Sequence, residues 1–429
     1  MWRPGDRIRN YRILAHLKTG GMATLYLARR EGAAGFYKRV VIKVIHHQHA
    51  RDENFIRMFL NEAMLSLRMQ DPNVVRVDEL GEVHGTYFIA MEYIPGRSLN
   101  EVCRSLVRLD RRMSIEIAVS IATRVADGLH SAHEARDDNG VVLDLVHRDV
   151  SPSNVILAHS GHVKLIDFGI ARARTSVEQT ASGIIKGKHQ YMAPEQALGQ
   201  TVDRRADIFS LAVVLWELLT MKPLFTVNST DELVARLGQG PVAPPSVWTP
   251  DVPVELDKAI VAALALDPQE RPYTARLFKE QIAGAVPEAM GIDAFLLARK
   301  IDALLPGNVA TSDARLVIDN GPQRGAEFSI RAEAGEWTVG RGSGVDWTLN
   351  DVDASREHFK LHRLDQGVLI EDLNSKNGLS VNGRAVRMIQ LHNGDIIRVV
   401  STFMRYEAIP RVAKAIPVCD ASVDGETAK

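Results

Sequence analysis

Residues 146–154 read VHRDVSPSN and hold the polar groups around which the rest of the chain is organised. Asp149 places a carboxylate five residues before the carboxamide of Asn154, in a loop that Pro152 interrupts. An apolar run follows at 155–157, and a second carboxylate, Asp167, opens the sequence Asp-Phe-Gly. Phosphoryl transfer from a nucleotide needs one carboxylate to orient a hydroxyl, and a carboxamide and a second carboxylate to hold Mg²⁺.

These residues resemble the catalytic loop of the eukaryotic-like protein kinase family, in which H-R-D is followed by an Asn five residues after the Asp. The resemblance implies that Asp149 is the catalytic base, that Asn154 and Asp167 are the metal ligands, and that ATP and Mg²⁺ are the cofactors. Three polar residues in a turn usually mark only a solvent-exposed loop. For that simpler explanation to hold here, several independent motifs would have to occur by chance in the order found in kinases.

The composition is typical of a soluble globular protein with two to three domains. The 429 residues are 45% hydrophobic and 24% charged, and the net charge of −1 gives no field for nucleic acid or an acidic membrane. Cys103 and Cys419 are too few for a disulfide framework, which fits a reducing compartment. Residues 1–10 lack the apolar core of a signal peptide, and the apolar run 211–219 is too short to span a bilayer. We therefore expect a cytoplasmic protein.

Residues 11–28 predict two strands around a turn that contains Gly20 and Gly21. Glycines let backbone amides approach phosphate closely, which is the task of the kinase Gly-rich loop. The family's first glycine falls on Lys18 and its third on Ala23, so only the middle glycine, Gly20, is kept. Alone, such a loop is more often an ordinary hairpin turn, and its position before the next motif favours the nucleotide site.

The β-branched strand 40–43 ends in Lys43, at the family's spacing for the lysine that holds the α and β phosphates. Apolar residues at helical spacing predict a helix over 54–69, and we expect Glu62 in this helix to form an ion pair with Lys43. Such a pair would direct the Lys43 ammonium at the phosphates. The simpler alternatives are a solvated edge lysine and a glutamate on a solvated helix face.

Residues 87–94 predict a strand that runs into a Pro-Gly turn, which resembles the hinge between kinase lobes. By this resemblance, adenine bonds to the backbone at Glu92 and Ile94, and Met91 guards the pocket behind it. The apolar side chains expected around adenine, which would be core in any fold, are Leu17, Leu25, Val41 and Ile156.

Residues 170–192 are rich in hydroxyls and precede Ala-Pro-Glu, which resembles an activation segment and its end. In the family, the Arg before the catalytic base pairs with a phosphate there, and this Arg is Arg148. We therefore predict phosphorylation of Thr175 or Thr180, because a phosphate adds about 1.5 to 2 negative charges that can order the segment.

The helical run 207–219 and the sequence Asp-Pro-Gln-Glu-Arg-Pro at 267–272 complete the resemblance, which covers residues 11 to about 285. The family pairs the arginine of this last motif, Arg271, with the glutamate of Ala-Pro-Glu, Glu195. We expect the same pair to brace the activation segment.

Two departures from the family pattern compensate for one another in our interpretation. Kinases for Ser and Thr carry Lys two residues after the catalytic Asp, where this chain has Ser151, and Thr at the position of Lys188. We hypothesise that Lys188 supplies the cation that Ser151 cannot, near the γ phosphate. The alternative is that Lys188 is a solvated loop residue and Ser151 a local cap.

From residue 314 the pattern changes to short alternating strands with Gly and Asn turns, which predicts a β-sandwich. The expected strands are 315–319, 327–330, 337–339, 358–364, 368–370 and 396–400. Four motifs in order resemble the forkhead-associated family, which binds phosphothreonine peptides. They are Gly-Arg at 340–341, Ser-Arg-Glu-His at 355–358, Asn-Ser-Lys-Asn-Gly at 374–378 and Val-Asn-Gly at 381–383.

The resemblance assigns a phosphopeptide site to loops at one end of the sandwich. It implies that Arg341 and Ser355 bind the phosphate, that Arg356 and Lys376 add charge, and that Asn377 holds the peptide main chain, while His358 buttresses the loop from inside. Without the family, the two arginines would be solvated turn charges and Asn377 part of a hairpin turn.

The expected fold is therefore an α+β two-lobed kinase fold followed by an all-β sandwich. The domain prediction places the kinase at 1–285, with lobes at about 11–94 and 95–285, a helical extension and linker at 286–313, the sandwich at 314–408 and a disordered tail at 409–429. An amphipathic helical stretch at 288–305 is expected to pad the large lobe or to form a dimer contact.

We expect a Ser/Thr protein kinase whose sandwich recruits phosphothreonine proteins or its own phosphorylated activation segment, with no nucleic-acid or membrane partner. Two alternatives remain open. One is a pseudokinase scaffold that acts through phosphopeptide binding, which the departures at Lys18 and Ser151 favour. The other is a small-molecule phosphotransferase, which would not need Ala-Pro-Glu or a phosphothreonine reader.

Overall fold

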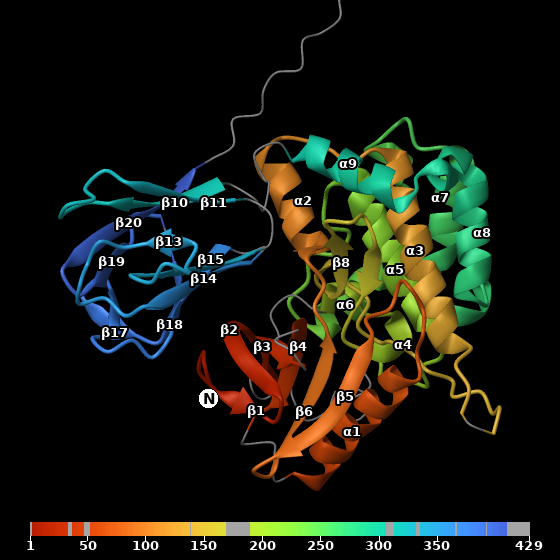
Figure 1. Cartoon of the computed structure of the whole chain (residues 1–429). Coiled ribbons are helices and arrows are strands. Elements are labelled where there is room, and N and C mark those ends of the chain that lie inside the picture. The colour runs from red at the N-terminus through yellow and green to blue at the C-terminus, as the bar shows by residue number, and fades with distance from the viewer. Residues whose placement is uncertain are drawn as a thin grey trace, which may run out of the picture. The chain divides into compact units, whose positions relative to one another are not determined.

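The computed structural model describes residues 2–32, 37–46, 52–137, 139–168, 189–305, 313–331, 335–364, 367–391 and 393–409. The chain divides into two compact units, Met1–Leu304 and Leu305–Lys429, which Figure 1 shows in red to green and in blue tones. Within the described residues, no helix has both the length and the apolar character that a membrane crossing requires.

The first unit begins with a six-stranded antiparallel sheet in the order β1-β2-β3-β4-β6-β5. Its strands are β1 (Arg7–Ile8), β2 (Tyr11–Thr19), β3 (Ala23–Glu31), β4 (Tyr37–Ile45), β5 (Val77–Val83) and β6 (Thr86–Glu92). Side chains alternate between two faces along each strand. On β4, Val40, Ile42 and Val44 enter a core on one face, whereas Ile45 joins a second core on the other face, against which Val41 packs.

Helix α1 (Glu53–Leu67) packs on this second core. It begins at Asp52, whose carboxylate accepts the backbone N–H groups of Asn54 and Phe55 at 3.0 and 3.1 Å. Such a cap satisfies donors that a helix start leaves unpaired. Phe55, Phe59 and Ala63 recur at helical spacing and are buried, so the expected helix over 54–69 is confirmed.

The second part of the first unit is mostly helical (Figure 1). Its helices are α2 (Leu99–Arg108), α3 (Ile115–His133), α4 (Pro194–Ala197), α5 (Arg205–Thr220), α6 (Thr230–Leu237), α7 (Val254–Ala263), α8 (Ala275–Ala285) and α9 (Ala294–Leu304). A small sheet of β7 (Gly96–Ser98), β8 (Val155–Ala158) and β9 (Val163–Leu165) lies beside them. Helix α5 is hydrophobic on all sides and almost fully buried, as expected of a helix at the centre of a lobe.

The amphipathic stretch expected over 288–305 is two helical pieces instead of one. A 3-10 turn covers Pro287–Gly291, and α9 starts afresh after Asp293, whose carboxylate accepts the N–H of Leu296 at 2.7 Å. We expected Phe295 on the apolar face of this stretch, but Phe295 is 70% exposed whereas Leu297 is buried. Because the helix starts again after Asp293, α9 buries a different face than one continuous helix over 288–305 would.

The extension packs against the helical lobe of the first unit. Gly161, in the turn between β8 and β9, lies so close to α9 that a Cβ atom there would be 1.6 Å from the carbonyl oxygen of Ala294. Arg111 donates to the carbonyls of Ala303 and Leu304 at 2.9 and 3.1 Å, which satisfies the end of α9. The prediction that this segment pads the large lobe is therefore confirmed.

The second unit is a sandwich of two antiparallel-rich sheets, in the orders β11-β10-β20-β19-β16-β17 and β13-β12-β14-β15-β18. The first contains β10 (Asp313–Ile318), β11 (Glu327–Ile330), β16 (Leu379–Val381), β17 (Arg384–Val386), β19 (Ile396–Val399) and β20 (Thr402–Ile409). The second contains β12 (Glu336–Gly340), β13 (Trp347–Thr348), β14 (Phe359–Leu364), β15 (Gly367–Asp372) and β18 (Met388–Leu391).

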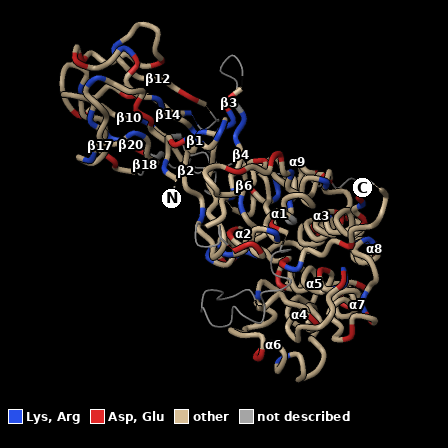
Figure 2. The backbone as a smooth tube through the Cα atoms, turned by 90° about the horizontal axis from the view of Figure 1, so that it is seen from below, with Lys and Arg blue, Asp and Glu red and all other residues tan. Residues whose placement is uncertain are grey.

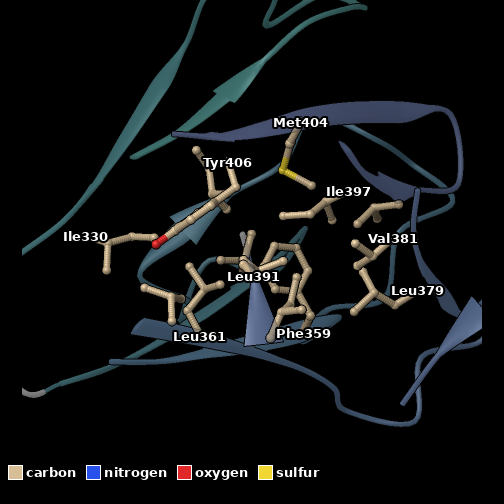
Figure 3. Packing of buried hydrophobic residues seen from close by; sticks show 14 of the residues in the cluster. Ile330, Phe359, Leu361, Leu379, Val381, Leu391, Ile397, Met404 and Tyr406 are labelled. Carbon is tan, nitrogen blue, oxygen red and sulfur yellow. The ribbon is translucent and has the colours of Figure 1, made fainter. Parts of the chain in front are cut away.

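One hydrophobic core lies between the two sheets of the sandwich. Figure 3 shows Phe359 and Leu361 of β14 facing Met404 and Tyr406 of β20 across this core. The spacing of two in each strand puts both members of each pair on the inner face. The packing of the two inner faces agrees with the predicted sandwich.

A charged cluster crosses the other face of β14. The two ring nitrogens of His362 lie 2.8 Å from carboxylate oxygens of Glu336 of β12 and Glu371 of β15, and when the ring is protonated each N–H donates to one carboxylate. Burial alone would lower the pKa of His362, but the hydrogen bonds to the two glutamates outweigh it and raise that pKa above its ordinary value. Protonated His362 therefore links three neighbouring strands.

Charged residues are spread over both units. Figure 2 shows Lys and Arg interspersed with Asp and Glu along the backbone of each unit. Arg276 and Glu280 of α8 form an exposed pair on one helix at 3.1 Å. Pairs of this kind contribute little to stability.

Candidate functional site

The catalytic-loop motif folds so that Asn154 holds Asp149. Residues Pro152–Asn154 form a 3-10 turn, which starts at a proline because such a position needs no N–H donor. The turn brings Asn154 Nδ2 to 2.8 Å from both Oδ2 and the backbone oxygen of Asp149. Because Nδ2 faces Asp149, Oδ1 of Asn154 is the atom left to face a cation.

Asp207 of α5 positions the backbone of this loop. Its carboxylate accepts the N–H groups of His147 and Arg148 at 2.7 and 2.8 Å and contacts His133 Nε2 at 2.8 Å. Asp207 is fully buried, which alone would raise its pKa, but the hydrogen bonds with His133 and the His147 backbone and the nearby imidazoles hold that pKa below its ordinary value. The loop is therefore fixed by a buried carboxylate on a central helix.

His147 joins the catalytic loop to the segment that carries the second carboxylate. The backbone N–H of Asp149 donates to His147 Nδ1 at 3.2 Å, so the other ring nitrogen carries the proton and donates to the carbonyl of Ile166 at 3.1 Å. Burial lowers the pKa of His147, which keeps the ring neutral. Its ring also packs against Phe168 at a centroid distance of 4.5 Å.

Lys43 reaches the second carboxylate across the lobes. Its Nζ donates to Asp167 Oδ1 at 3.1 Å, a contact between residues 124 positions apart. Alternation along β4 places Lys43 on the same face as Val41, next to the core that α1 covers. Glu62 lies in α1, but its side chain is outside the described residues, so its ion pair with Lys43 stays a prediction.

Two of these residues have a left-handed backbone. Arg148 and Asp167 have φ values of 64° and 56°, a region that is unfavourable for residues with a side chain. Such strain persists only where the surroundings enforce it, and it is concentrated at functional sites. Both residues lie next to hydrogen bonds of Asp207, His147 or Lys43 that enforce it.

The residues expected around a nucleotide come from the strand lobe and from β8. Gly20 and Gly21 form the exposed turn between β2 and β3, where the N–H of Gly20 donates to the carbonyl of Ala23 at 2.9 Å. The N–H of Glu92 donates to the carbonyl of Arg76 at 2.9 Å, and its side chain pairs with Lys164 at 2.7 Å. The apolar residues expected near adenine are each half-buried: Leu17, Leu25, Val41 and Ile156.

Residues 169–188 lie outside the described residues, and with them the predicted Thr175, Thr180 and Lys188. The segment that follows is held by Glu195 of α4. Arg271 binds both carboxylate oxygens of Glu195 at 2.7 and 2.8 Å, and both side chains are buried, so this predicted pair is confirmed. A two-pronged arrangement fixes orientation as well as distance.

The recognition motifs of the sandwich meet at one end. Ser355 Oγ accepts the N–H of Lys376 at 3.0 Å, and Asn377 Nδ2 donates to the carbonyl of Asp353 at 2.9 Å, so two loops are tied together. His358 is fully buried beneath them and contacts the N–H of Ser355 and the carbonyl of Gly378 at 3.0 and 3.1 Å. The predicted buttress role of His358 is confirmed.

Three cations surround these loops. The N–H of Arg341 donates to the carbonyl of Ser355 at 3.0 Å, and the side chains of Arg341, Arg356 and Lys376 are all exposed. Gly340 allows the close approach of this loop, because a Cβ atom there would lie 2.3 Å from the carbonyl oxygen of Arg356. The arrangement can offer charge-assisted hydrogen bonds to an anion.

Asp351 and Asp207 are site residues that the sequence reasoning missed. Asp351 is buried and accepts hydrogen bonds from Ser401 and Thr402 at 2.7 and 2.9 Å, which pins the loop before Ser355. For Asp207 a signal was available in the sequence. Asp207 is an acid within a nearly continuous apolar helix, which is costly unless the carboxylate is paired.

Comparisons with known proteins match both units. The protein kinase domain model matches residues 11–282, and the FHA domain model matches residues 337–400. The tyrosine-protein kinase MasK of Myxococcus xanthus (strain DK1622) is 40% identical over 293 residues, which are 67% of this chain and 45% of that protein. The serine/threonine-protein kinase PrkC of Bacillus subtilis (strain 168) is 33% identical over 282 residues, 66% of this chain and 41% of that protein.

The chain thus spans less than half of the length of these two relatives. A solved structure of the PknI kinase domain of Mycobacterium tuberculosis is 28% identical, has a TM-score of 0.50 and covers 67% of this chain and 100% of its own. The model match extends over more than half of the present sequence and contains the whole catalytic constellation described above. The chain therefore belongs to the protein kinase family, and it carries an FHA domain after the kinase domain.

Proposed function

We propose that this chain transfers the γ-phosphate of ATP to hydroxyl groups of protein Ser and Thr residues, with Mg²⁺ as the metal. The observation that carries the proposal is that side chains from distant parts of the sequence contact one another. Lys43 of the strand lobe contacts Asp167, Asn154 contacts Asp149, and His147 joins the two carboxylate segments, although these residues are scattered over the sequence. Phosphoryl transfer depends on such positioning.

Each side chain has a distinct task in this proposal. Asp149 accepts the proton of the acceptor hydroxyl and is held in place by Asn154. Asn154 Oδ1 and the carboxylate of Asp167 are hard oxygen donors, which fit Mg²⁺, and the metal when bound neutralises charge on the phosphates. Lys43, with Glu62 as its proposed partner, binds the α and β phosphates.

The adenine and phosphate contacts are proposed at the lobe interface. The half-buried apolar faces of Leu17, Leu25, Val41 and Ile156 suit a flat aromatic base, and the hinge backbone at Glu92 and Ile94 offers it hydrogen bonds. Gly20 and Gly21 would lie over the phosphates, where the lack of side chains lets backbone amides approach.

Two kinds of hydroxyl group could accept the phosphate: those of Ser and Thr, or that of Tyr. Similarity to PrkC, a serine/threonine-protein kinase, supports Ser and Thr, whereas the identity of 40% with MasK, a tyrosine-protein kinase, favours Tyr.

Ser151 and Lys188 bear on this choice, because Lys188 would supply the cation that other Ser/Thr kinases carry at position 151. The Lys188→Thr variant should lose turnover, and Ser151→Lys combined with Lys188→Thr should recover much of it. Full activity of Lys188→Thr would refute the exchange.

The FHA domain is proposed to bind phosphothreonine peptides. Arg341 and Ser355 would hold the phosphate, Arg356 and Lys376 would add charge, and Asn377 would hold the peptide main chain. The exposed cations around two tied loops support this. The ligand would be a phosphorylated partner protein, or the chain's own activation segment phosphorylated at Thr175 or Thr180, in cis or in trans.

Incubation of the purified chain with labelled ATP and Mg²⁺ tests the proposal. We expect phosphate on the chain or on an added protein, and none with Asp149→Asn. Phosphoamino-acid analysis then separates Ser and Thr from Tyr, and mass spectrometry locates the modified positions. Equal labelling by Asp149→Asn would refute the assigned role of Asp149, and an unlabelled wild type would favour the scaffold alternative.

A further inference from the structure

Helix α9 lies beyond the stretch that matches the protein kinase model, which ends at residue 282, yet it packs on the strand pair that leads to the catalytic groups. A Cβ atom at Gly161 would lie 1.6 Å from the carbonyl oxygen of Ala294 and 3.0 Å from the backbone nitrogen of Ala298. The turn between β8 and β9 therefore meets the first turn of α9 backbone to backbone. In such close packing, neither element can shift without displacing the other.

The helix is also anchored on its inner face and at its end. Leu297 is 1% exposed, whereas Phe295 is 70% exposed, so one face of α9 is seated on the lobe and another is in solvent. At the end of the helix, Arg111 from the connection between α2 and α3 donates to the carbonyls of Ala303 and Leu304 at 2.9 and 3.1 Å. Figure 1 shows α9 beside α2 and α3. The position of α9 on the lobe is therefore fixed at several points.

The turn under α9 is bonded to the hinge between the lobes. The N–H of His159, in this turn, donates to the carbonyl of Pro95 at 2.9 Å. Pro95 directly follows Ile94, whose backbone we propose as an adenine contact. Gly161 lies two residues after His159, so the point where α9 packs and the point that bonds to the hinge belong to one short turn.

The two strands that this turn joins carry further groups of the proposed nucleotide site. Strand β8 contains Ile156, one of the apolar residues expected around adenine, which pairs with Ser98 just after the hinge. Strand β9 ends at Leu165, two residues before the proposed metal ligand Asp167. The turn on which α9 packs is thus connected to the hinge, the adenine pocket and the metal site.

We propose that α9 is a positioning element of the nucleotide site: its seat on the β8–β9 turn holds the hinge and Ile156 in the geometry that binds adenine. This inference rests on the proposed function and adds to the site a helix from outside the family match. Coupling between two sites is reciprocal, so a nucleotide that binds better when α9 is seated must in turn hold α9 more firmly.

Leu297→Ala in the full chain tests this role, because it removes the buried side chain that seats α9. We expect its affinity for ADP, measured by calorimetric titration, to fall about fivefold or more, the lower end of typical coupling between sites. In steady-state assays, the KM for ATP should rise while kcat is kept, because saturating nucleotide returns the helix to its seat. A loss of stability alone would not separate KM from kcat in this way.

Phe295→Ala is the matched control, since it shortens an outward side chain of the same helix and should leave ADP affinity as in the wild type. Arg111→Ala is a second test, because it loosens the other end of α9 without touching the β8–β9 turn, and it should also weaken ADP binding. Wild-type ADP affinity in Leu297→Ala, or in Arg111→Ala where the first variant does not fold, would overturn the inference. A wild type that binds no ADP would instead refute the proposed function, and the inference with it.

Discussion

Replacing Arg271 by Ala should strongly destabilise the first unit. Arg271 is completely buried and binds both oxygens of Glu195, and its other N–H groups donate to the carbonyls of Ala265, Leu266 and Arg205 at 2.8, 3.1 and 3.3 Å. Its removal leaves a carboxylate and three carbonyls buried without this partner. Breaking a buried ion pair on one side costs about 3–5 kcal/mol. For a unit of this size, that corresponds to a fall in melting temperature of roughly 5–8 °C.

Differential scanning calorimetry of the full chain measures this loss. Because the chain has two compact units, the substitution should lower one transition and leave the other in place. The control is Arg276→Ala, which removes the exposed pair with Glu280 and should shift melting by no more than about 1 °C. If Arg271→Ala shifts melting as little as this control, the ion pair does not brace the lobe as we describe.

Three further predictions concern the sandwich. Hydrogen bonds to Glu336 and Glu371 raise the folded pKa of His362, so its stabilising contribution is complete below the unfolded pKa and is lost as pH rises through the folded pKa. His362→Gln should therefore remove the fall in stability of this unit that the wild type shows in denaturant titrations as pH rises above about 6.5. Arg341→Ala should abolish phosphothreonine-peptide binding in calorimetry while the circular dichroism spectrum stays unchanged. Gly340→Ala should lower both stability and peptide affinity, since its Cβ atom would collide with the neighbouring loop.

The catalytic loop could be predicted from the sequence because its chemistry lies in one short stretch. Asp149 and Asn154 are five residues apart, and their contact is local. Asp207 was missed as a functional residue because its partners, the N–H groups of His147 and Arg148, come from a loop about 60 positions earlier. The isolated acid in an apolar helix indicated a paired carboxylate, but backbone donors leave no mark in a sequence, so its partners could be identified only from the fold.

The expected strands of the sandwich match β10, β11, β12, β14, β15 and β19, whereas β13, β16, β17, β18 and β20 were missed, of which β20 is the longest. Its residues alternate as a strand should, with Met404 and Tyr406 buried. We assigned the sequence after residue 400 to no strand. The register of β20 between β10 and β19 is set by long-range pairing, which local patterns do not report.

The central claim is that Lys43, Asn154 and Asp167 act together on one magnesium nucleotide. Calorimetric titration of ATP into the full chain, with and without Mg²⁺, tests it most directly when repeated with Asp167→Asn. We predict that Mg²⁺ strengthens ATP binding to the wild type and has little effect on the variant, because a metal ligand has been lost. Equal strengthening in both proteins, or no affinity of the folded wild type for ATP, would contradict the account.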